Sequence, residues 1–122
     1  PYHAAFRAGV DHLVPTSIAP TLAEGIASAK PPRVAVVVAA VGGSGGAIVA
    51  VTEDEIVAAL RALARRGLYV EPTSAPAAAG LTQLLAAGVI RRDEITVLVL
   101  TGSGLKAPER IGELLGIRAP RA

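Results

Sequence analysis

Apolar and polar residues follow one another with a helical period in the middle of the chain. Thr52 and Glu55 have the spacing of a capping box, and Gly67 can end a helix. Between these signals the residues at helical spacing are apolar: Ile56, Leu60 and Leu63. The pattern predicts a helix that begins at Glu53 and buries one face.

The rest of the second half repeats a unit of strand and helix. Residues 68–70 and 95–100 are short apolar runs typical of buried strands, and each leads toward a helical pattern. The first of these helices begins near Ala75 and ends at Gly88, and the second has Pro108 in its first turn. The residues expected to face inward from the two helices are Leu81, Leu84, Leu85, Ile111, Leu114 and Leu115.

Strands that alternate with helices of about ten to fifteen residues are typical of βαβ units. We therefore expect an α/β fold with three layers, a mainly parallel sheet with helices on both faces. In such sheets ligands bind beyond the carboxyl ends of the strands. The turns that follow residues 70 and 100 are then the expected place for a site.

The first half of the chain has weaker periodicity. Residues 2–7 predict a short helix, and residues 21–30 predict a second helix that Pro31 ends. Residues 34–51 are rich in valine, alanine and glycine, and we expect a helix there, then a turn at the glycines and a strand over residues 47–51.

Composition limits the possible classes of function. The 122 residues suffice for a single domain, residues 1–122, with an aliphatic core, since the chain has two Tyr, one Phe and no Trp. A net charge of +2 with scattered arginines provides no basic stripe for nucleic acid. The chain lacks cysteine, and its longest apolar run, residues 34–41, is too short for a membrane span. The cytoplasm is the default compartment.

Three clusters are candidate sites. Residues 42–46, Gly-Gly-Ser-Gly-Gly, could cradle a phosphate, but here a strand follows the glycines, which favours a plain turn. Glu71 follows an apolar strand, and Thr73 or Ser74 would cap the next helix. Residues 101–104, Thr-Gly-Ser-Gly, follow another strand, so this turn and Glu71 face one pocket if the strands are parallel. Both histidines are expected on the surface, and no metal site is expected.

Four stretches together resemble one enzyme family. The carboxyl-terminal part of threonine synthase, a fold type II pyridoxal-phosphate enzyme, is similar to "GLYVEPTSAPAAAGLTQLLAAG" (residues 67–88) followed by "VLVLTGSGLKAP" (residues 97–108). The segments that precede those motifs resemble "APTLAEGIA" (residues 19–27) and "SGGAIVAVTEDEI" (residues 44–56). Because the chain opens with Pro1 and contains no Met, we expect a carboxyl-terminal fragment of a longer enzyme.

The resemblance implies an enzyme that converts O-phosphohomoserine and water to threonine and phosphate, with pyridoxal phosphate as its cofactor. It implies that Thr101 makes a hydrogen bond to the pyridine nitrogen and leaves that nitrogen largely unprotonated. It also implies that Gly102 lets the backbone pass close to the ring, and that Glu71 lies near the bound amino-acid substrate.

The resemblance also shows what this chain lacks. The lysine that anchors the cofactor covalently and the loop that binds its phosphate belong to the amino-terminal half in this family, and neither motif is present. Lys30 and Lys106 do not fit the anchoring role, so we expect no catalytic residue in this chain alone and a missing amino-terminal half as its partner. One alternative is a threonine or serine dehydratase of the same fold type, although the Gly-Leu-Lys that ends "TGSGLK" argues against it. Another is a non-catalytic isolated domain whose exposed apolar surface self-associates.

Overall fold

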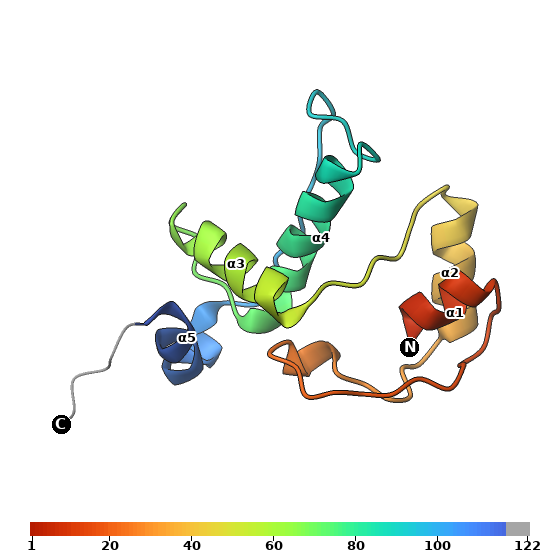
Figure 1. Cartoon of the computed structure of the whole chain (residues 1–122), viewed down its shortest axis with the longest axis horizontal. Helices are drawn as coiled ribbons and strands as arrows, with labels where there is room; N and C mark the ends of the chain where they lie inside the picture. Colours follow the sequence, from red (N-terminus) through yellow and green to blue (C-terminus); the bar gives the residue numbers. More distant parts are fainter. Residues whose placement is uncertain (117–122) are drawn as a thin grey trace. The chain divides into compact units, whose positions relative to one another are not determined.

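The computed structural model describes residues 1–116, which form helices joined by extended chain (Figure 1). The α-helices are α1 (Tyr2–Ala8), α2 (Val34–Gly43), α3 (Glu53–Ala64), α4 (Ala75–Ala86) and α5 (Pro108–Leu115). The short 3-10 helices are η1 (Glu24–Ile26), η2 (Pro72–Ser74) and η3 (Gly104–Lys106). There are two compact units: Pro1–Pro20 with Gly25–Ala50, and Thr21–Glu24 with the described chain from Val51 onward. The assignment of residues 1–122 to one domain stays a prediction.

The first unit contains α1 and α2. α1 ends at Gly9, which has a left-handed backbone (φ 68°), and the Tyr2 hydroxyl donates a hydrogen bond of 2.6 Å to the Pro32 carbonyl. The helices expected over residues 2–7 and at the start of the valine-rich segment are confirmed. Neither α2 nor any other helix in residues 1–116 is long and apolar enough to cross a membrane.

The prediction of a helix over residues 21–30 is wrong. The chain forms only the short η1 there, and the Ala23 N–H donates to Thr21 Oγ1 at 3.1 Å in a local turn. Ile26 is 62% exposed, whereas Ala23 is 1% exposed. A short helix is stable only when an apolar face packs against other elements, and in this segment the side chains that pack against the core are Leu22 and Ala23, near its start.

α3 begins as its sequence predicts. Thr52 Oγ1 accepts a hydrogen bond from the Glu55 N–H at 3.3 Å, and Glu55 Oε2 accepts one from the Thr52 N–H at 2.7 Å. The other carboxylate oxygen of Glu55 accepts a hydrogen bond of 2.8 Å from Gln83 Nε2 on α4. These bonds favour the ionised form and lower the pKa of Glu55, the backbone bond from Thr52 being the largest cause. One side chain thus caps α3 and links it to its neighbour.

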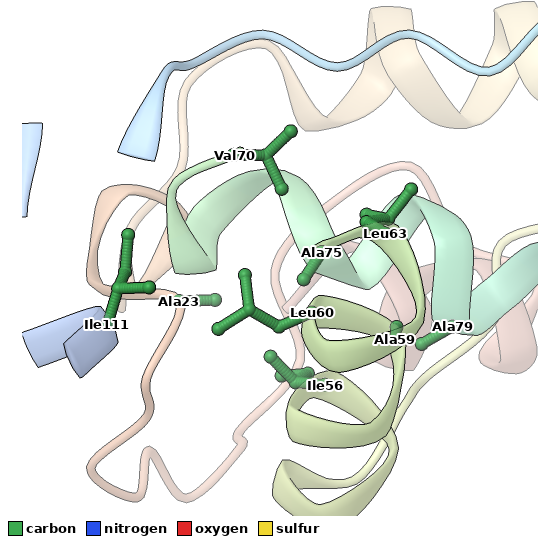
Figure 2. Close-up of a cluster of buried hydrophobic side chains, with 9 residues drawn as sticks. All are labelled: Ala23, Ile56, Ala59, Leu60, Leu63, Val70, Ala75, Ala79 and Ile111. Carbon is green, nitrogen blue, oxygen red and sulfur yellow. The ribbon is translucent and has the colours of Figure 1, made fainter. Parts of the chain in front are cut away.

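The core of the second unit is aliphatic and lies where α3 packs against α4 (Figure 2). Leu60 is 2% exposed, and Figure 2 shows its side chain directed toward Ala23. The core residues of α4 are alanines, which let the two helices approach closely. The full set of buried side chains is Ala23, Ile56, Ala59, Leu60, Leu63, Val70, Ala75, Ala79 and Ile111. The inward face predicted for α3 is confirmed, but the leucines predicted to point inward from α4 are only partly buried.

The mainly parallel sheet is not confirmed in residues 1–116. Within that range the segments 47–51 and 95–100 contain no strand, and the one backbone bridge, between Val70 and Ser103, is antiparallel. Extended chain becomes a strand only where a second segment pairs with its N–H and C=O groups. No backbone hydrogen bond joins residues 95–100 to another described segment, so these residues stay extended and largely exposed.

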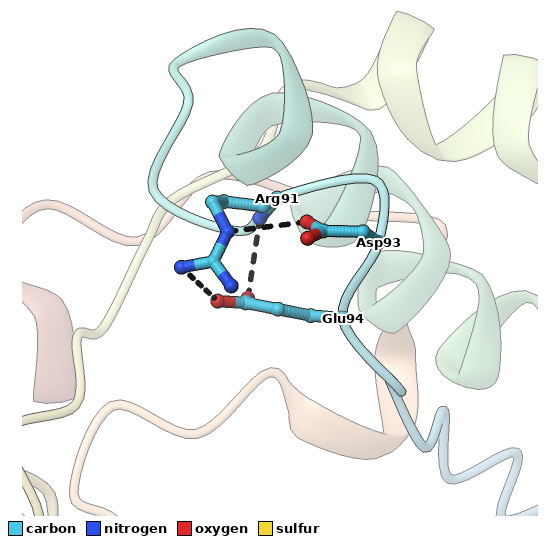
Figure 3. A network of polar contacts seen from close by, with 3 residues as sticks. All are labelled: Arg91, Asp93 and Glu94. Atoms are coloured by element: carbon cyan, nitrogen blue, oxygen red, sulfur yellow. Dashed lines mark hydrogen bonds and ion pairs between the residues drawn. The ribbon is translucent and has the colours of Figure 1, made fainter.

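A polar turn separates α4 from residues 95–100. Arg91 Nε lies 3.1 Å from Asp93 Oδ1, and Arg91 Nη1 lies 3.3 Å from Glu94 Oε1 (Figure 3). The Arg91 N–H also donates to Glu94 Oε2 at 3.2 Å. The three side chains are between 40% and 76% exposed, so water screens the ion pairs and they add little to stability.

Replacing Glu55 with Gln should lower the midpoint of thermal unfolding at neutral pH, because a neutral amide accepts the Thr52 and Gln83 hydrogen bonds more weakly. A carboxylate whose pKa is lowered on folding stabilises the protein above its ordinary pKa of about 4.3, and this contribution is lost as pH falls through the folded value. The difference between the two proteins should therefore vanish in acid. Circular dichroism melts from neutral to acidic pH measure it.

Asp54→Asn is the matched control for this measurement. Asp54 is exposed and lies in the same first turn of α3, so it shares the favourable interaction with the helix dipole. We expect a smaller change in the midpoint than for Glu55→Gln. Equal losses in the two variants would show that charge near the helix start, and not the Glu55 hydrogen bonds, is responsible.

Candidate functional site

Two segments of the second unit pair through their backbones. The Glu71 N–H donates to the Gly102 carbonyl, and the Gly104 N–H donates to the Tyr69 carbonyl, each at 3.0 Å. The sequence brings Glu71 and the Thr-Gly-Ser-Gly turn to one place only if their segments are parallel. The structure does bring them together, but the segments run antiparallel.

Ser74 connects the turn to the start of α4. Its Oγ accepts a hydrogen bond of 2.9 Å from the Gly102 N–H and lies 3.3 Å from Thr101 Oγ1. Of the two residues expected as a cap, Thr73 or Ser74, Ser74 does not cap the helix, since its side chain makes no cap hydrogen bond. The reason is that Ser74 ends η2 and is already helical (φ −86°, ψ −22°), whereas a capping residue needs an extended backbone. One feature of the sequence could have indicated the position of Ser74. Ser74 follows Glu71 by three residues, and in a 3-10 turn residues three apart lie on the same side.

Gly102 packs against the Glu71 side chain with no room for a side chain of its own. A methyl group on Gly102 would overlap the Glu71 carboxylate. The Glu71 side chain is 20% exposed, and its Oε2 lies 3.9 Å from Nζ of Lys106, which is 67% exposed. The carboxylate therefore lines the turn, keeps some contact with solvent and has a cation on its open side.

Gly104 joins the turn to the hydrophobic core. A Cβ atom at this position would lie 2.8 Å from the Tyr69 ring and 2.9 Å from Ile111 Cδ1. Ser103, between the two glycines, is exposed, and its Oγ accepts a hydrogen bond of 3.3 Å from the Leu105 N–H at the start of η3. The turn is thus fixed by one glycine against Glu71 and by another against the core.

The open side of this turn presents complementary chemistry. Thr101 is exposed, and its hydroxyl can donate one hydrogen bond and accept others. The Glu71 carboxylate can only accept, so it suits an ammonium group. In residues 1–116 no group of three His, Cys, Asp or Glu side chains could hold a metal ion. The site therefore suits a small organic ligand with a hydrogen-bond acceptor and a positive charge.

The other sequence candidates lie in the first unit. Residues 42–46 end α2, where the Ser44 hydroxyl donates to the Val41 carbonyl at 2.9 Å. The carbonyl end of a helix dipole disfavours a phosphate, and the turn expected there is confirmed. His12 is exposed as expected, 3.3 Å from Asp11 Oδ1.

A shallow groove between α3 and α4 is a separate feature of the second unit. Its charged residue, Glu55, already accepts hydrogen bonds from Thr52 and Gln83. The groove is lined by Glu55, Ala58, Ala59, Ala62, Ala79 and Thr82. Alanine side chains offer no polar contacts, so the groove carries less chemistry than the turn at residues 101–104.

Comparison with known proteins identifies the family. Residues 1–102 match the family described as pyridoxal-phosphate dependent enzyme. The chain is 42% identical over 110 residues to threonine synthase from Methanocaldococcus jannaschii, which covers 89% of this chain and 27% of the relative. It is 38% identical over 112 residues to threonine synthase from Methanosarcina acetivorans (91% of this chain, 28% of the relative). A third relative, threonine synthase from Halalkalibacterium halodurans, is 40% identical over 89 residues (72% of this chain, 25% of the relative).

This chain belongs to the pyridoxal-phosphate dependent enzyme family. The matched parts span between 25% and 28% of the length of these three relatives. The resemblance carried by "VEPTSAP" and "TGSGLK" is confirmed, and pyridoxal phosphate is the cofactor of the family. The family has fold type II, so the coarse fold assignment is confirmed, while the sheet layers are not confirmed in residues 1–116.

Gly102→Ala should destabilise the second unit by about 1–3 kcal/mol, because the new methyl group overlaps the Glu71 carboxylate and forces a local shift. In a Glu71→Ala background the same substitution should be nearly neutral, since the obstructing side chain is gone. Urea unfolding of the wild type, the two single variants and the double variant measures this coupling. Gly42→Ala is the control, because a Cβ there meets nothing within 4 Å. Equal losses from Gly102→Ala in the two backgrounds would contradict the packing described.

Proposed function

We propose that this chain supplies the pyridine-nitrogen side of the cofactor site in an enzyme that converts O-phosphohomoserine and water to threonine and phosphate. The observation that carries the proposal is the hydroxyl of Thr101, an exposed residue that lies beside a buried serine and precedes a glycine with no room for a side chain. The likeness to threonine synthases over 89% of the chain supports this reaction. Such an enzyme is a lyase of threonine biosynthesis.

The donor set of the turn fits a pyridine ring. A neutral ring nitrogen accepts one hydrogen bond and donates none, so it needs a donor on the protein. The Gly102 N–H is already engaged by Ser74 Oγ, and the exposed Thr101 hydroxyl supplies a donor instead. Gly102 carries no side chain, so its backbone can pass close to a ring, while the direction of its missing Cβ atom is filled by Glu71. We assign Thr101 and Gly102 to cofactor binding on this basis.

Thr101 would also tune the cofactor. When bound, pyridoxal phosphate supplies an electron-withdrawing ring for reactions of amino acids. A hydroxyl group does not ionise near neutral pH, so Thr101 holds the ring nitrogen by a hydrogen bond without protonating it. A carboxylic acid in the same place would favour the protonated nitrogen and a stronger withdrawal of electrons.

Glu71 is the proposed contact for the amino-acid substrate. Its carboxylate lies beside the turn and is partly exposed, and an amino acid carries an ammonium group of opposite charge. The covalent anchor and the phosphate-binding loop are proposed to come from an amino-terminal half. Lys106 is paired with Glu71, which does not support an anchoring role for it.

A second candidate function, association through an exposed extended segment, has its own support. In residues 95–100 the side chains of Ile95, Val97 and Val99 are 99%, 83% and 68% exposed. An apolar extended segment without a backbone partner is a template for pairing with another chain. We propose that the chain alone self-associates through this segment, and that an amino-terminal half covers it in a complete enzyme. The cytoplasmic location stays a prediction.

Thr101→Val in the complete enzyme should weaken pyridoxal phosphate about tenfold, because one hydrogen bond to the ring nitrogen is lost. Thr101→Ser keeps the hydroxyl and should bind nearly as the wild type does. Ser103→Ala removes the neighbouring exposed hydroxyl as a control. Fluorescence titration of the apoenzyme measures the affinities, and an unchanged affinity in Thr101→Val would contradict the cofactor assignment.

The reaction itself is tested with the same complete enzyme. Release of phosphate from O-phosphohomoserine, with threonine as the other product, is the expected outcome. Conversion of threonine to a 2-oxo acid and ammonia, without phosphate release, would support the dehydratase alternative instead.

Val97→Lys should shift the 122-residue chain toward the monomer, because a charge on an exposed strand opposes pairing between chains. Size-exclusion chromatography with light scattering over a range of concentrations measures the mass. Val89→Lys is the matched control, since Val89 is 63% exposed but lies outside the segment. A wild-type chain that is monomeric at every concentration would count against self-association.

A further inference from the structure

Ser74 is the one polar residue that is buried within residues 1–116. It is 2% exposed, so water does not reach its hydroxyl, and any partner must come from the protein. Two partners are present: the Gly102 N–H at 2.9 Å and Thr101 Oγ1 at 3.3 Å. Both lie on a segment 27 to 28 positions away in the sequence. The Ser74 hydroxyl therefore contacts the proposed cofactor-binding turn as well as lying at the start of α4.

The two contacts determine where the Ser74 proton points. A hydroxyl has one proton and two lone pairs, and one lone pair of Ser74 Oγ accepts the Gly102 N–H. If Thr101 donated to the second lone pair, the Ser74 proton would be buried with no acceptor among the described residues. An unpaired buried donor is unfavourable, so the stable arrangement has Ser74 donating to Thr101 Oγ1.

This direction leaves the Thr101 proton free to point outward. Thr101 is exposed, and once its oxygen accepts from Ser74 its own proton is available for a ligand. We propose that Ser74 is a positioning residue that makes Thr101 a hydrogen-bond donor toward an acceptor nitrogen. The inference rests on the proposed function, since the acceptor is the pyridine nitrogen of the cofactor.

The test uses four variants of this chain within the complete enzyme. Ser74→Ala removes the hydroxyl, and Ser74→Cys keeps a side chain of similar volume with a thiol that donates and accepts only weakly. Thr101→Val removes the proposed ring contact. Ser103→Ala is the matched control, because this neighbouring hydroxyl accepts from the Leu105 N–H and does not contact Thr101 in the described structure.

The first readout needs no ligand and is amide hydrogen exchange at Gly102. Ser74→Ala and Ser74→Cys should speed exchange at Gly102 about tenfold, since the acceptor of this N–H is lost or weakened. Ser103→Ala should leave it within about twofold of the wild type. Unchanged exchange in both Ser74 variants, or a wild-type rate in Ser74→Cys alone, would overturn the inference, because packing volume would then explain the role of Ser74.

The second readout is the ring ¹⁵N resonance of labelled pyridoxine 5′-phosphate, a probe with no aldehyde to react with lysine. The wild type and Ser103→Ala should shift this resonance, Thr101→Val should abolish the shift, and both Ser74 variants should reduce it by at least about half. A full shift in the Ser74 variants with none in Thr101→Val would overturn the role of Ser74 and leave the proposed function intact. A shift that Thr101→Val does not alter, or no shift in the wild type, would overturn the proposed function itself.

Discussion

The antiparallel pairing of residues 69–71 with residues 102–104 is the interaction on which the second unit depends. Two backbone hydrogen bonds of 3.0 Å join segments that are about thirty residues apart in sequence. They bring Glu71 beside the glycine turn and place the turn over Ile111 of α5. Without this pairing, the substrate and cofactor candidates would lie on unconnected loops, and α5 would lose its contact with the core.

The glycines of the turn show how closely this pairing is packed. Gly102 faces the Glu71 carboxylate and Gly104 faces Tyr69 and Ile111, so neither position has room for a Cβ atom. Thr101 precedes both and is exposed. The backbone therefore holds Thr101 at the surface, next to the buried Ser74. Such an arrangement suits a residue that must present a hydrogen bond in one direction, as the cofactor role requires.

The sequence predicted those structural features that depend on contacts between residues close together in the chain. Thr52 and Glu55 form the expected capping box, and Gly88 follows α4 in a left-handed conformation, because each depends on residues only a few positions away. The helix over residues 21–30 failed because, within this segment, the side chains that pack against the core are Leu22 and Ala23, both near its start. Residues 95–100 alone could not show whether they form a strand, since a strand also needs a second segment to pair with its backbone.

The candidate site was predictable in part for the same reason. Glu71, Thr101 and Gly102 were identified from their places after apolar runs and from a family resemblance, and the structure brings them together. Ser74 was assigned to helix capping, because its sequence position looks like a cap. Its contact with Gly102 depends on the antiparallel pairing, which no local pattern reports.

Amide chemical-shift mapping of the complete enzyme, with the residues of this chain labelled with ¹⁵N and pyridoxine 5′-phosphate as the ligand, tests the central claim most directly. The account predicts that the ligand perturbs residues 71–74 and 101–104 together, since both segments form one site. It also predicts no comparable change in the amide chemical shifts of residues 42–46. These residues lie at the carboxyl-terminal end of α2, where the negative end of the helix dipole disfavours a phosphate. Perturbation of residues 42–46 alone, or none at residues 101–104, would contradict it.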